Sequence, residues 1–230
     1  MNERVALITG ASRGIGAAVA RSFSERGARV AMLSRSGSDL GLADALGLRC
    51  DVRDRQQVFD SVARAVEQFG SLDCVVANAG VGAYGPFLEM DNAHVEEMVD
   101  VNLKGTIYTA QAALPHLVRA GGGDFVSLAS VAGLRAFPGE AVYNASKFGQ
   151  LGLTRALDHE LREHGVRATC ICPGGVATDF ALETGRSQAA LKGMMSPEDV
   201  AEVVTFCVTR SRGWRMLTAS FRPDAEPSWG

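Results

Sequence analysis

The sequence predicts an α/β fold: a Rossmann-type, doubly wound parallel sheet of about seven strands with helices on both faces. Three observations lead to this prediction. Apolar runs of strand length alternate with amphipathic stretches of helix length along the chain. A glycine-rich turn joins the first of these runs to the first helix. The central runs are apolar at nearly every position, as strands buried on both faces require.

Four strands are expected in the first half of the chain, at residues 5–9, 29–34, 48–52 and 72–77. Each is a short, largely apolar run that lies between helical stretches or turns. Amphipathic stretches between them predict helices at residues 14–26, 39–46 and 55–69. The middle helix is much shorter than its neighbours, so the scaffold is reduced on that edge of the sheet.

Three more strands are expected in the second half, at residues 124–129, 166–172 and 214–221. Long helices at residues 92–119 and 140–164 precede the first two of them. Ser196, followed by Pro197, is typical of the start of a last helix. Helical crossovers between strands imply right-handed βαβ units and a parallel sheet. We expect a single domain over residues 1–230, because no linker or repeat divides the chain.

The composition excludes several classes of function. The formal net charge is -3 and no segment has a surplus of basic residues, so we expect neither nucleic-acid binding nor membrane binding. The longest apolar runs have strand length, which is too short to span a bilayer. A strand-like run begins at Val5 and leaves no room for a signal peptide, so we expect a cytoplasmic protein.

The cysteines predict buried thiols rather than disulfides or a metal site. Their number is odd and they lie in apolar runs, at Cys50, Cys74, Cys170, Cys172 and Cys207. Cys170 and Cys172 share one face of a strand, but a metal site there needs further ligands. The four histidines lie in helical stretches without metal spacing, so no metal is expected.

The turn at residues 9–16 predicts a nucleotide-binding site. Gly10, Gly14 and Gly16 permit a tight turn and a close approach of the backbone to a ligand. The helix that follows offers free N–H groups to a pyrophosphate. Its spacing, Gly-x-x-x-Gly-x-Gly, differs from the common Gly-x-Gly-x-x-Gly fingerprint. The same turn contributes Ser12, Arg13 and Ile15.

The end of the second strand favours NADP(H) over NAD(H). Enzymes that bind NAD usually carry an acidic residue there for the ribose hydroxyls, whereas this chain has Ser34 followed by Arg35. A guanidinium binds a 2′-phosphate through bidentate, charge-assisted hydrogen bonds, and Arg13 is within reach of the same group. The alternative is that both arginines are ordinary solvated side chains.

Tyr143 and Lys147 form a candidate acid/base pair. A spacing of four places both side chains on one face of a helix. A lysine ammonium favours the phenolate, so we expect it to lower the pKa of the tyrosine. The same spacing also occurs by chance on amphipathic helices, where a half-buried tyrosine lies beside an extended lysine. The motifs elsewhere in the chain decide between these interpretations.

Residues 4–210 resemble the short-chain dehydrogenase/reductase family in its short single-domain form. The resemblance rests on motifs in a fixed order: the glycine turn, Asp51-Val52, Asn78-Ala79-Gly80, Asn102, Ser130, the pair Tyr143 and Lys147, and the turn at residues 173–178. Two regions depart from the family pattern. The stretch between Arg35 and Asp51 is short, and the tail at residues 221–230 lacks the usual glycine-rich ending. The tail is expected either to pack across a subunit interface or to be a loose end.

The resemblance implies roles for these residues. It implies adenine contacts at Asp51 and Val52, ribose contacts at Asn78, Ala79 and Gly80, and carboxamide contacts from a turn that holds Pro173, Gly174, Val176 and Thr178. It also implies a catalytic tetrad. Ser130 polarises the substrate carbonyl and Tyr143 transfers a proton. Lys147 lowers the pKa of Tyr143 and binds the nicotinamide ribose, and Asn102 supports a water that relays protons.

We expect a carbonyl or alcohol substrate in a largely apolar pocket. Its expected lining is Val81, Gly82, Tyr84, Leu134, Arg135 and Phe137. Residues 181–195 contain Gly185, Gly193 and several small residues, which favours a mobile lid. Arg186 in this segment and Arg135 either bind an anionic substrate group or face water.

Two alternatives to a carbonyl reductase stay open. A nucleotide-sensing protein without catalysis would use the same scaffold, although such proteins often lose the tyrosine or the lysine. An epimerase or dehydratase usually carries a different glycine spacing and a larger substrate domain. The helices at residues 92–119 and 140–164 have more apolar surface than one sheet face needs, and the resemblance implies that they pair in a homodimer or homotetramer.

Overall fold

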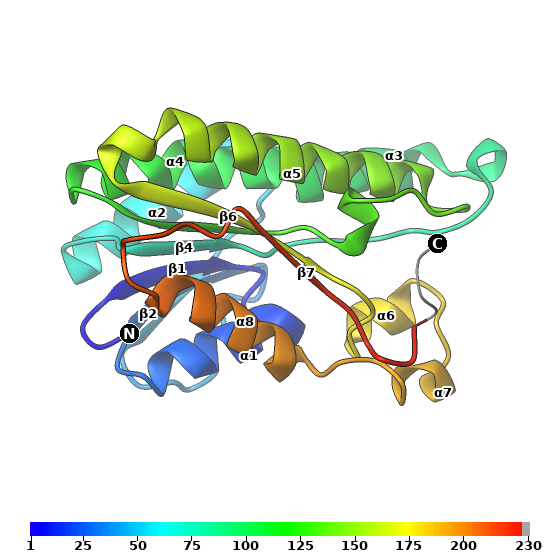
Figure 1. Ribbon diagram of the computed structural model, residues 1–230, viewed down its shortest axis with the longest axis horizontal. Helices are drawn as coiled ribbons and strands as arrows, with labels where there is room; N and C mark the ends of the chain where they lie inside the picture. Colours follow the sequence, from blue (N-terminus) through cyan, green and yellow to red (C-terminus); the bar gives the residue numbers. More distant parts are fainter. Residues whose placement is uncertain (227–230) are drawn as a thin grey trace.

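The computed structural model describes residues 1–226 as a parallel sheet between two layers of helices (Figure 1). The strands are β1 (Val5–Thr9), β2 (Arg29–Ser34), β3 (Ala45–Arg49), β4 (Cys74–Ala77), β5 (Gly123–Leu128), β6 (Val166–Pro173) and β7 (Thr218–Phe221). Their order in the sheet is β3-β2-β1-β4-β5-β6-β7, and every neighbouring pair is parallel. The order reverses between β1 and β4, where doubly wound sheets bind ligands at the carboxyl ends of the strands. The predicted fold class is therefore confirmed.

Five longer helices cover the two faces of the sheet. One face carries α1 (Gly14–Ser24) and α8 (Pro197–Thr209); the other carries α2 (Arg55–Phe69), α4 (Gly105–Arg119) and α5 (Ala141–Glu160) (Figure 1). Each face has its own hydrophobic core, and the neighbours Leu7 and Ile8 of β1 point into opposite cores, as the alternation of a strand requires. None of the helices in residues 1–226 has the length and apolar character needed to cross a membrane.

Three short helices lie near the carboxyl ends of the strands. They are α3 (Asn92–Met98), α6 (Asp179–Glu183) and α7 (Gln188–Leu191). The last two lie together at one end of the molecule, so part of residues 181–195, the segment predicted to be a lid, is helical (Figure 1). The five cysteines are free and buried, as predicted.

The prediction of a short helix at residues 39–46 is wrong. Residues 36–44 form turns, and β3 begins at Ala45, three residues before the expected strand. Leu40 and Asp44 have positive φ angles of 56° and 53°, which a right-handed helix does not allow. The carboxylate of Asp39 also accepts a hydrogen bond from the N–H of Gly41 at 2.9 Å, which closes a turn.

The single helix expected at residues 92–119 is interrupted. A π-helical turn, Val99–Lys104, separates α3 from α4 and contains Asn102. The Asn102 side chain accepts a hydrogen bond from the Val81 N–H at 2.8 Å and donates to the Val81 carbonyl at 2.9 Å. These bonds tie the turn to the chain that follows β4, and such single turns occur frequently at functional sites.

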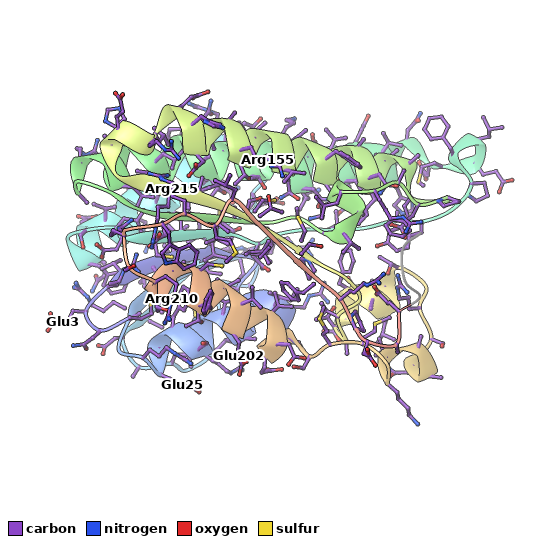
Figure 2. All side chains as sticks on the ribbon, viewed as in Figure 1. Glu3, Glu25, Arg155, Glu202, Arg210 and Arg215 are labelled. Atoms are coloured by element: carbon purple, nitrogen blue, oxygen red, sulfur yellow. The ribbon has the colours of Figure 1, made fainter. Side chains whose placement is uncertain are left out.

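A buried carboxylate joins several strands at the amino edge of the sheet. Asp124 is 3% exposed, and it pairs with Arg4 at 2.6 Å, with Arg167 at 2.8 Å and with Arg212 at 3.7 Å. Other charged side chains, such as Glu25, Glu202 and Arg155, are exposed on the outer helical layers (Figure 2). Buried charge is therefore concentrated in a few places.

Candidate active site

A cleft of about 710 Å³ opens at the carboxyl edge of the sheet. It is lined by nearly every residue predicted to bind the cofactor: Gly10, Ser12, Arg13, Gly14, Ile15, Ser34, Arg35, Asp51, Val52, Asn78, Ala79, Gly80, Tyr143, Lys147, Pro173, Gly174, Val176 and Thr178. Gly16 lies beneath the surface, where an added Cβ would overlap the carbonyl oxygen of Gly10. The structure therefore brings residues from five separate loops into one cavity.

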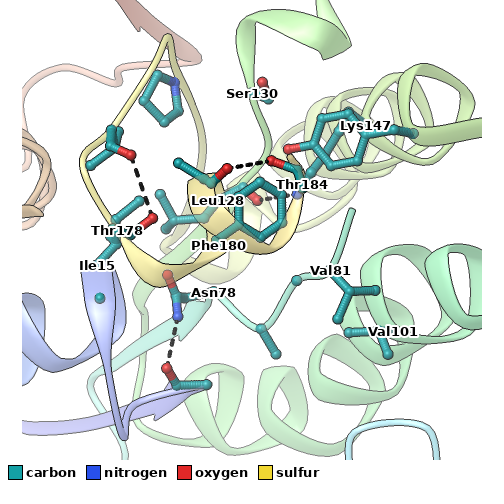
Figure 3. Close-up of a pocket in the computed structure, with 18 of the residues that line it drawn as sticks. Ile15, Asn78, Val81, Val101, Leu128, Ser130, Lys147, Thr178, Phe180 and Thr184 are labelled. Atoms are coloured by element: carbon teal, nitrogen blue, oxygen red, sulfur yellow. Dashed lines mark hydrogen bonds between the residues drawn. The ribbon is translucent and has the colours of Figure 1, made fainter. Parts of the chain in front are cut away.

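The glycine turn is held against the end of β4. Gly10 has a φ of +65°, and an added Cβ would lie 2.9 Å from the Cα of Ala79. The Asn78 side chain donates hydrogen bonds to the carbonyls of Thr9 at 2.9 Å and Gly10 at 3.2 Å (Figure 3). No side chain caps the N-terminus of α1, whose N-cap residue is Arg13. This geometry fits a pyrophosphate, because backbone N–H groups and the positive end of the helix dipole stay available to it.

The two arginines predicted to bind a 2′-phosphate differ in their contacts at the adenosine end of the cleft. Arg35 is exposed and lines the cleft. Arg13 instead makes a bidentate pair with Glu183 of α6, at 2.6 and 3.0 Å. Arg53 bonds to the carboxylate of Asp51 at 2.6 Å, and this hydrogen bond lowers the pKa of Asp51. Of the two arginines predicted to bind the 2′-phosphate, Arg35 is thus the one that lines the cleft without an ion pair to Glu183.

Ser130 and the pair on α5 form the wall opposite the glycine turn. Ser130 and Lys147 lie on one side of the pocket and Ile15 lies on the other (Figure 3). The hydroxyl of Ser130 accepts a hydrogen bond from the N–H of Ala132 at 3.1 Å, so its own proton is available to a substrate. Tyr143 is 6% exposed, and the neighbouring hydroxyl of Ser130 acts to lower the pKa of its phenol.

The pKa of Tyr143 differs from the sequence-based expectation. Burial raises the pKa of this phenol above its ordinary value, and the hydrogen bond with Ser130 only partly offsets the shift. The Lys147 ammonium lies 5.5 Å from the centre of the tyrosine ring. Because this shift is a net effect dominated by burial, the lowering contribution expected from Lys147 stays a prediction. Tyr143 is a neutral phenol, which is the form that donates a proton.

Lys147 is a buried cation with neutral partners. It is 3% exposed, and its ammonium donates to the Leu128 carbonyl at 3.1 Å and to Oε1 of Gln150 at 2.8 Å. Burial lowers the pKa of Lys147 to about 8. No carboxylate pairs with it among residues 1–226. Its charge is therefore sensitive to whatever enters the cleft.

Asn102 lies behind the cleft rather than in its wall. Its side chain is 0% exposed and is bonded to the backbone of Val81 and to the hydroxyl of Ser146 at 3.0 Å. Its main-chain oxygen accepts a hydrogen bond from the hydroxyl of Thr106 at 2.7 Å. Asn102 thus fixes the loop after β4 that carries Val81, and both its side chain and its main chain take part in the hydrogen bonds behind the cleft.

Comparisons with known proteins agree with this geometry. The sequence profile described as short chain dehydrogenase matches residues 4–189. Oxidoreductase UcpA of Salmonella typhimurium is 38% identical over 214 residues, which cover 89% of this chain and 79% of that protein. This chain belongs to the short-chain dehydrogenase family.

Solved structures of this family superpose over almost the whole chain. An alcohol dehydrogenase from the archaeon Thermococcus sibiricus, complexed with 5-hydroxy-NADP, has a TM-score of 0.89 and 30% identity, covering 98% of this chain and 99% of that one. A 3-ketoacyl-(acyl-carrier-protein) reductase from Brucella melitensis, complexed with NADH, has a TM-score of 0.87 and 25% identity, covering 95% and 97%. Both neighbours hold a nicotinamide nucleotide, so the family uses this type of cofactor.

The substrate end of this short-chain dehydrogenase agrees only in part with the predicted lining. Val81, Tyr84, Arg135, Phe137 and Arg186 line the cleft. The other two predicted residues lie outside it, because Gly82 packs beneath Phe180 and Thr184 and Leu134 packs against the cluster around Leu151.

The sequence reasoning missed several lining residues, among them Phe180, Glu140 and Glu226. Phe180 packs 6.0 Å from the ring of Tyr143, while Tyr84 makes an edge contact at 5.5 Å. Glu140 lies three residues before Tyr143, so helical spacing was a usable signal for it, and burial raises the pKa of its carboxyl group. Glu226 had no such signal, because it belongs to the tail.

The tail packs on its own chain up to residue 226. The carboxylate of Glu226 accepts a hydrogen bond from the N–H of Gly175 at 2.7 Å, beside the turn predicted to hold the carboxamide. Of the tail expected at residues 221–230, the last four residues lie outside the described part of the chain. The described part of the tail is therefore packed on its own chain rather than loose, and its packing across a subunit interface stays a prediction.

Proposed function

We propose that the chain is an NADP(H)-dependent oxidoreductase that transfers a hydride between nicotinamide and a carbonyl or alcohol substrate. The convergence of Ser130, Tyr143 and Lys147 on the cleft that holds the glycine turn carries this proposal. A hydride acceptor bound beside Ser130 would meet a hydroxyl donor and a neutral phenol at once. The cofactors named for the two solved relatives support the reaction class and leave both nucleotides open.

Each residue has a defined task in the proposed reaction. When bound, the nicotinamide supplies the hydride. Ser130 donates a hydrogen bond to the substrate oxygen as negative charge develops there. Tyr143 transfers its proton to that oxygen, and the Lys147 ammonium stabilises the tyrosinate that remains. Lys147 also binds the nicotinamide ribose, and the main-chain oxygen of Asn102 holds the Thr106 hydroxyl behind the site.

A carbonyl panel with reduced cofactor tests this mechanism. We expect NADPH oxidation with some ketone or aldehyde, and Tyr143→Phe should lower turnover about 100- to 10,000-fold while NADPH binding persists. Wild-type turnover in Tyr143→Phe would overturn the mechanism. Cofactor binding by calorimetry without turnover on any carbonyl compound would favour the non-catalytic nucleotide sensor instead.

The preference for NADP(H) rests on the residues after β2. Arg35 faces the cleft. The position before it holds Ser34, so no carboxylate is present there to repel a 2′-phosphate. Arg35→Ala should weaken NADPH binding about tenfold or more and leave NADH binding nearly unchanged. Arg26→Ala is a matched control, because Arg26 is exposed and hydrogen-bonded within α1. Equal affinities for NADH and NADPH in the wild type would contradict the preference.

The remaining parts of the proposal concern movement and assembly. We propose a single domain over residues 1–230 in which residues 181–195 close over the substrate. A homodimer or homotetramer in the cytoplasm fits the 44% exposure of Phe148 on α5 and the five free thiols. A monomeric mass by light scattering would contradict the assembly, and recovery from a secreted fraction of the source cells would contradict the location.

A further inference from the structure

Gln150 is a buried amide whose two ends are both bonded next to the proposed catalytic lysine. It lies on α5, three residues after Lys147, and is 0% exposed. Its Oε1 accepts from the Lys147 ammonium at 2.8 Å, and its Nε2 donates to the hydroxyl of Thr106 at 2.7 Å. A buried amide is costly unless it is hydrogen-bonded, so these contacts fix the orientation of the Gln150 side chain.

The bonds continue from Gln150 to the main chain of Asn102. The Thr106 hydroxyl donates to the Asn102 carbonyl at 2.7 Å, and both residues are at most 3% exposed. Every donor in this chain of bonds points away from Lys147. The amide oxygen of Gln150 has no proton to return to the ammonium. The link therefore holds the lysine in place and supplies no direct path for protons.

We propose that Gln150 is a positioning residue that holds the Lys147 ammonium beside Tyr143 and joins it to Asn102, in the place where the family resemblance implies a water. The expected effect of Gln150 on turnover rests on the proposed function. The hydrogen bonds that carry it do not depend on the identity of the substrate.

Few ionisable groups compete with Gln150 for control of Lys147. Cys170 and Cys172 face it from β6, and Tyr143 lies on its own helix. The segments of β5, α4 and the loop after β4 near Lys147 present only neutral groups, such as the Leu128 carbonyl and Gly80. A neutral amide at position 150 stabilises the ammonium without pairing its charge. The lysine thus stays able to respond to a ribose or a tyrosinate.

Two substitutions of similar size separate positioning from packing. Gln150→Met removes the acceptor, so the lysine should lose its proton more readily and the alkaline limb of the kcat profile should move to lower pH by about one unit. Gln150→Glu adds a counter-charge, so the same limb should move to higher pH. At neutral pH, kcat of Gln150→Met should fall about tenfold.

Thr154→Val is the matched control. The Thr154 hydroxyl is buried on the same helix and donates to the main-chain oxygen of Gln150 at 2.7 Å, outside the link to Lys147. Its removal should lower the unfolding midpoint about as much as Gln150→Met and leave the pH profile unchanged. If the Gln150 variants fold and keep the wild-type pH profile, the proposal is overturned.

The three lysines of the chain permit a readout that does not need turnover. They are Lys104, Lys147 and Lys192. With ¹³C-labelled lysine, the buried Lys147 should give a separate NMR signal whose titration reports its pKa directly. Opposite shifts of that pKa in Gln150→Met and Gln150→Glu support the proposal even when no substrate is turned over. Unchanged titration in both variants overturns it, whatever the outcome for the proposed function.

Discussion

At the amino edge of the sheet a buried carboxylate is surrounded by cations, whereas at the carboxyl edge a buried cation has only neutral partners. Asp124 and Lys147 are each 3% exposed. Three arginines lie within 4 Å of Asp124, but Lys147 bonds to a carbonyl and an amide oxygen. The compensated charge stays charged and fastens strands together. The uncompensated charge costs stability, and it responds to a ligand or a neighbouring proton.

Asp124→Asn should give the largest change in stability. The substitution leaves the buried guanidinium of Arg167 without its counter-ion, and breaking such a pair costs about 3–5 kcal/mol. Urea unfolding measures the loss, with Asp60→Asn on the exposed face of α2 as a control. A loss below about 1 kcal/mol would show that the amino edge is not held by charge.

Lys147→Met should show the reverse pattern at the other edge. Turnover should fall about 100-fold or more, because the tyrosinate and the ribose lose the ammonium. The free energy of unfolding should stay the same or rise, since an apolar chain of similar length replaces an unpaired buried charge. Steady-state kinetics and urea unfolding on the same sample test both parts. A stability loss as large as that of Asp124→Asn would remove the distinction between the edges.

The buried charge of Lys147 should also make the free energy of unfolding depend on pH. Burial lowers the folded-state pKa of Lys147 to about 8, below its ordinary 10.5. Between these values the unfolded chain binds more protons, so stability rises with pH in that window. The unfolding free energy of the wild type, measured relative to Lys147→Met, should therefore increase from about pH 8 to about pH 10.5. A flat difference over this range would contradict the lowered pKa.

The smallest expected effect comes from an exposed ion pair at the mouth of the cleft. Glu183→Gln removes the carboxylate nearest to Arg13 and leaves only the longer contact with Asp179, and an exposed pair is worth at most about 1 kcal/mol. NADPH affinity should rise about two- to fivefold while NADH affinity and stability stay unchanged. Calorimetry with both nucleotides measures this, and Glu202→Gln on α8 serves as the control. A fall in NADPH affinity would show that Arg13 does not reach the 2′-phosphate.

Repeating local patterns made most of the fold and the cofactor cleft predictable. Apolar periodicity located all seven strands, and the glycines of residues 9–16 identified the phosphate turn. Gly37, Asp39 and Gly41 favour turns, but the positive φ angles of Leu40 and Asp44 were not predictable. The π turn at Asn102 depends on its bonds to Val81, which is 21 residues away in sequence. Local propensity contains no signal for the positive φ of Leu40 and Asp44 or for the π turn.

The chemistry of the site was less predictable than its location. Spacing placed Tyr143 beside Lys147 correctly, yet it contained no information on the burial that raises the tyrosine pKa. Leu134 has the same apolar character as true lining residues, but it packs into a separate cluster. Glu226 reaches the cleft only through the tertiary fold. In each case the missing information is depth of burial or a contact between distant segments.

The ion pairs of Asp124 also bear on how long the native protein persists. The carboxylate is 120 residues from Arg4 and 43 residues from Arg167 in sequence. Contacts of such separation require both halves of the sheet to be assembled, so they should form after the folding transition state. We expect Asp124→Asn to accelerate unfolding with little effect on the rate of refolding. This one carboxylate would then govern the lifetime of the folded chain rather than the speed at which it forms.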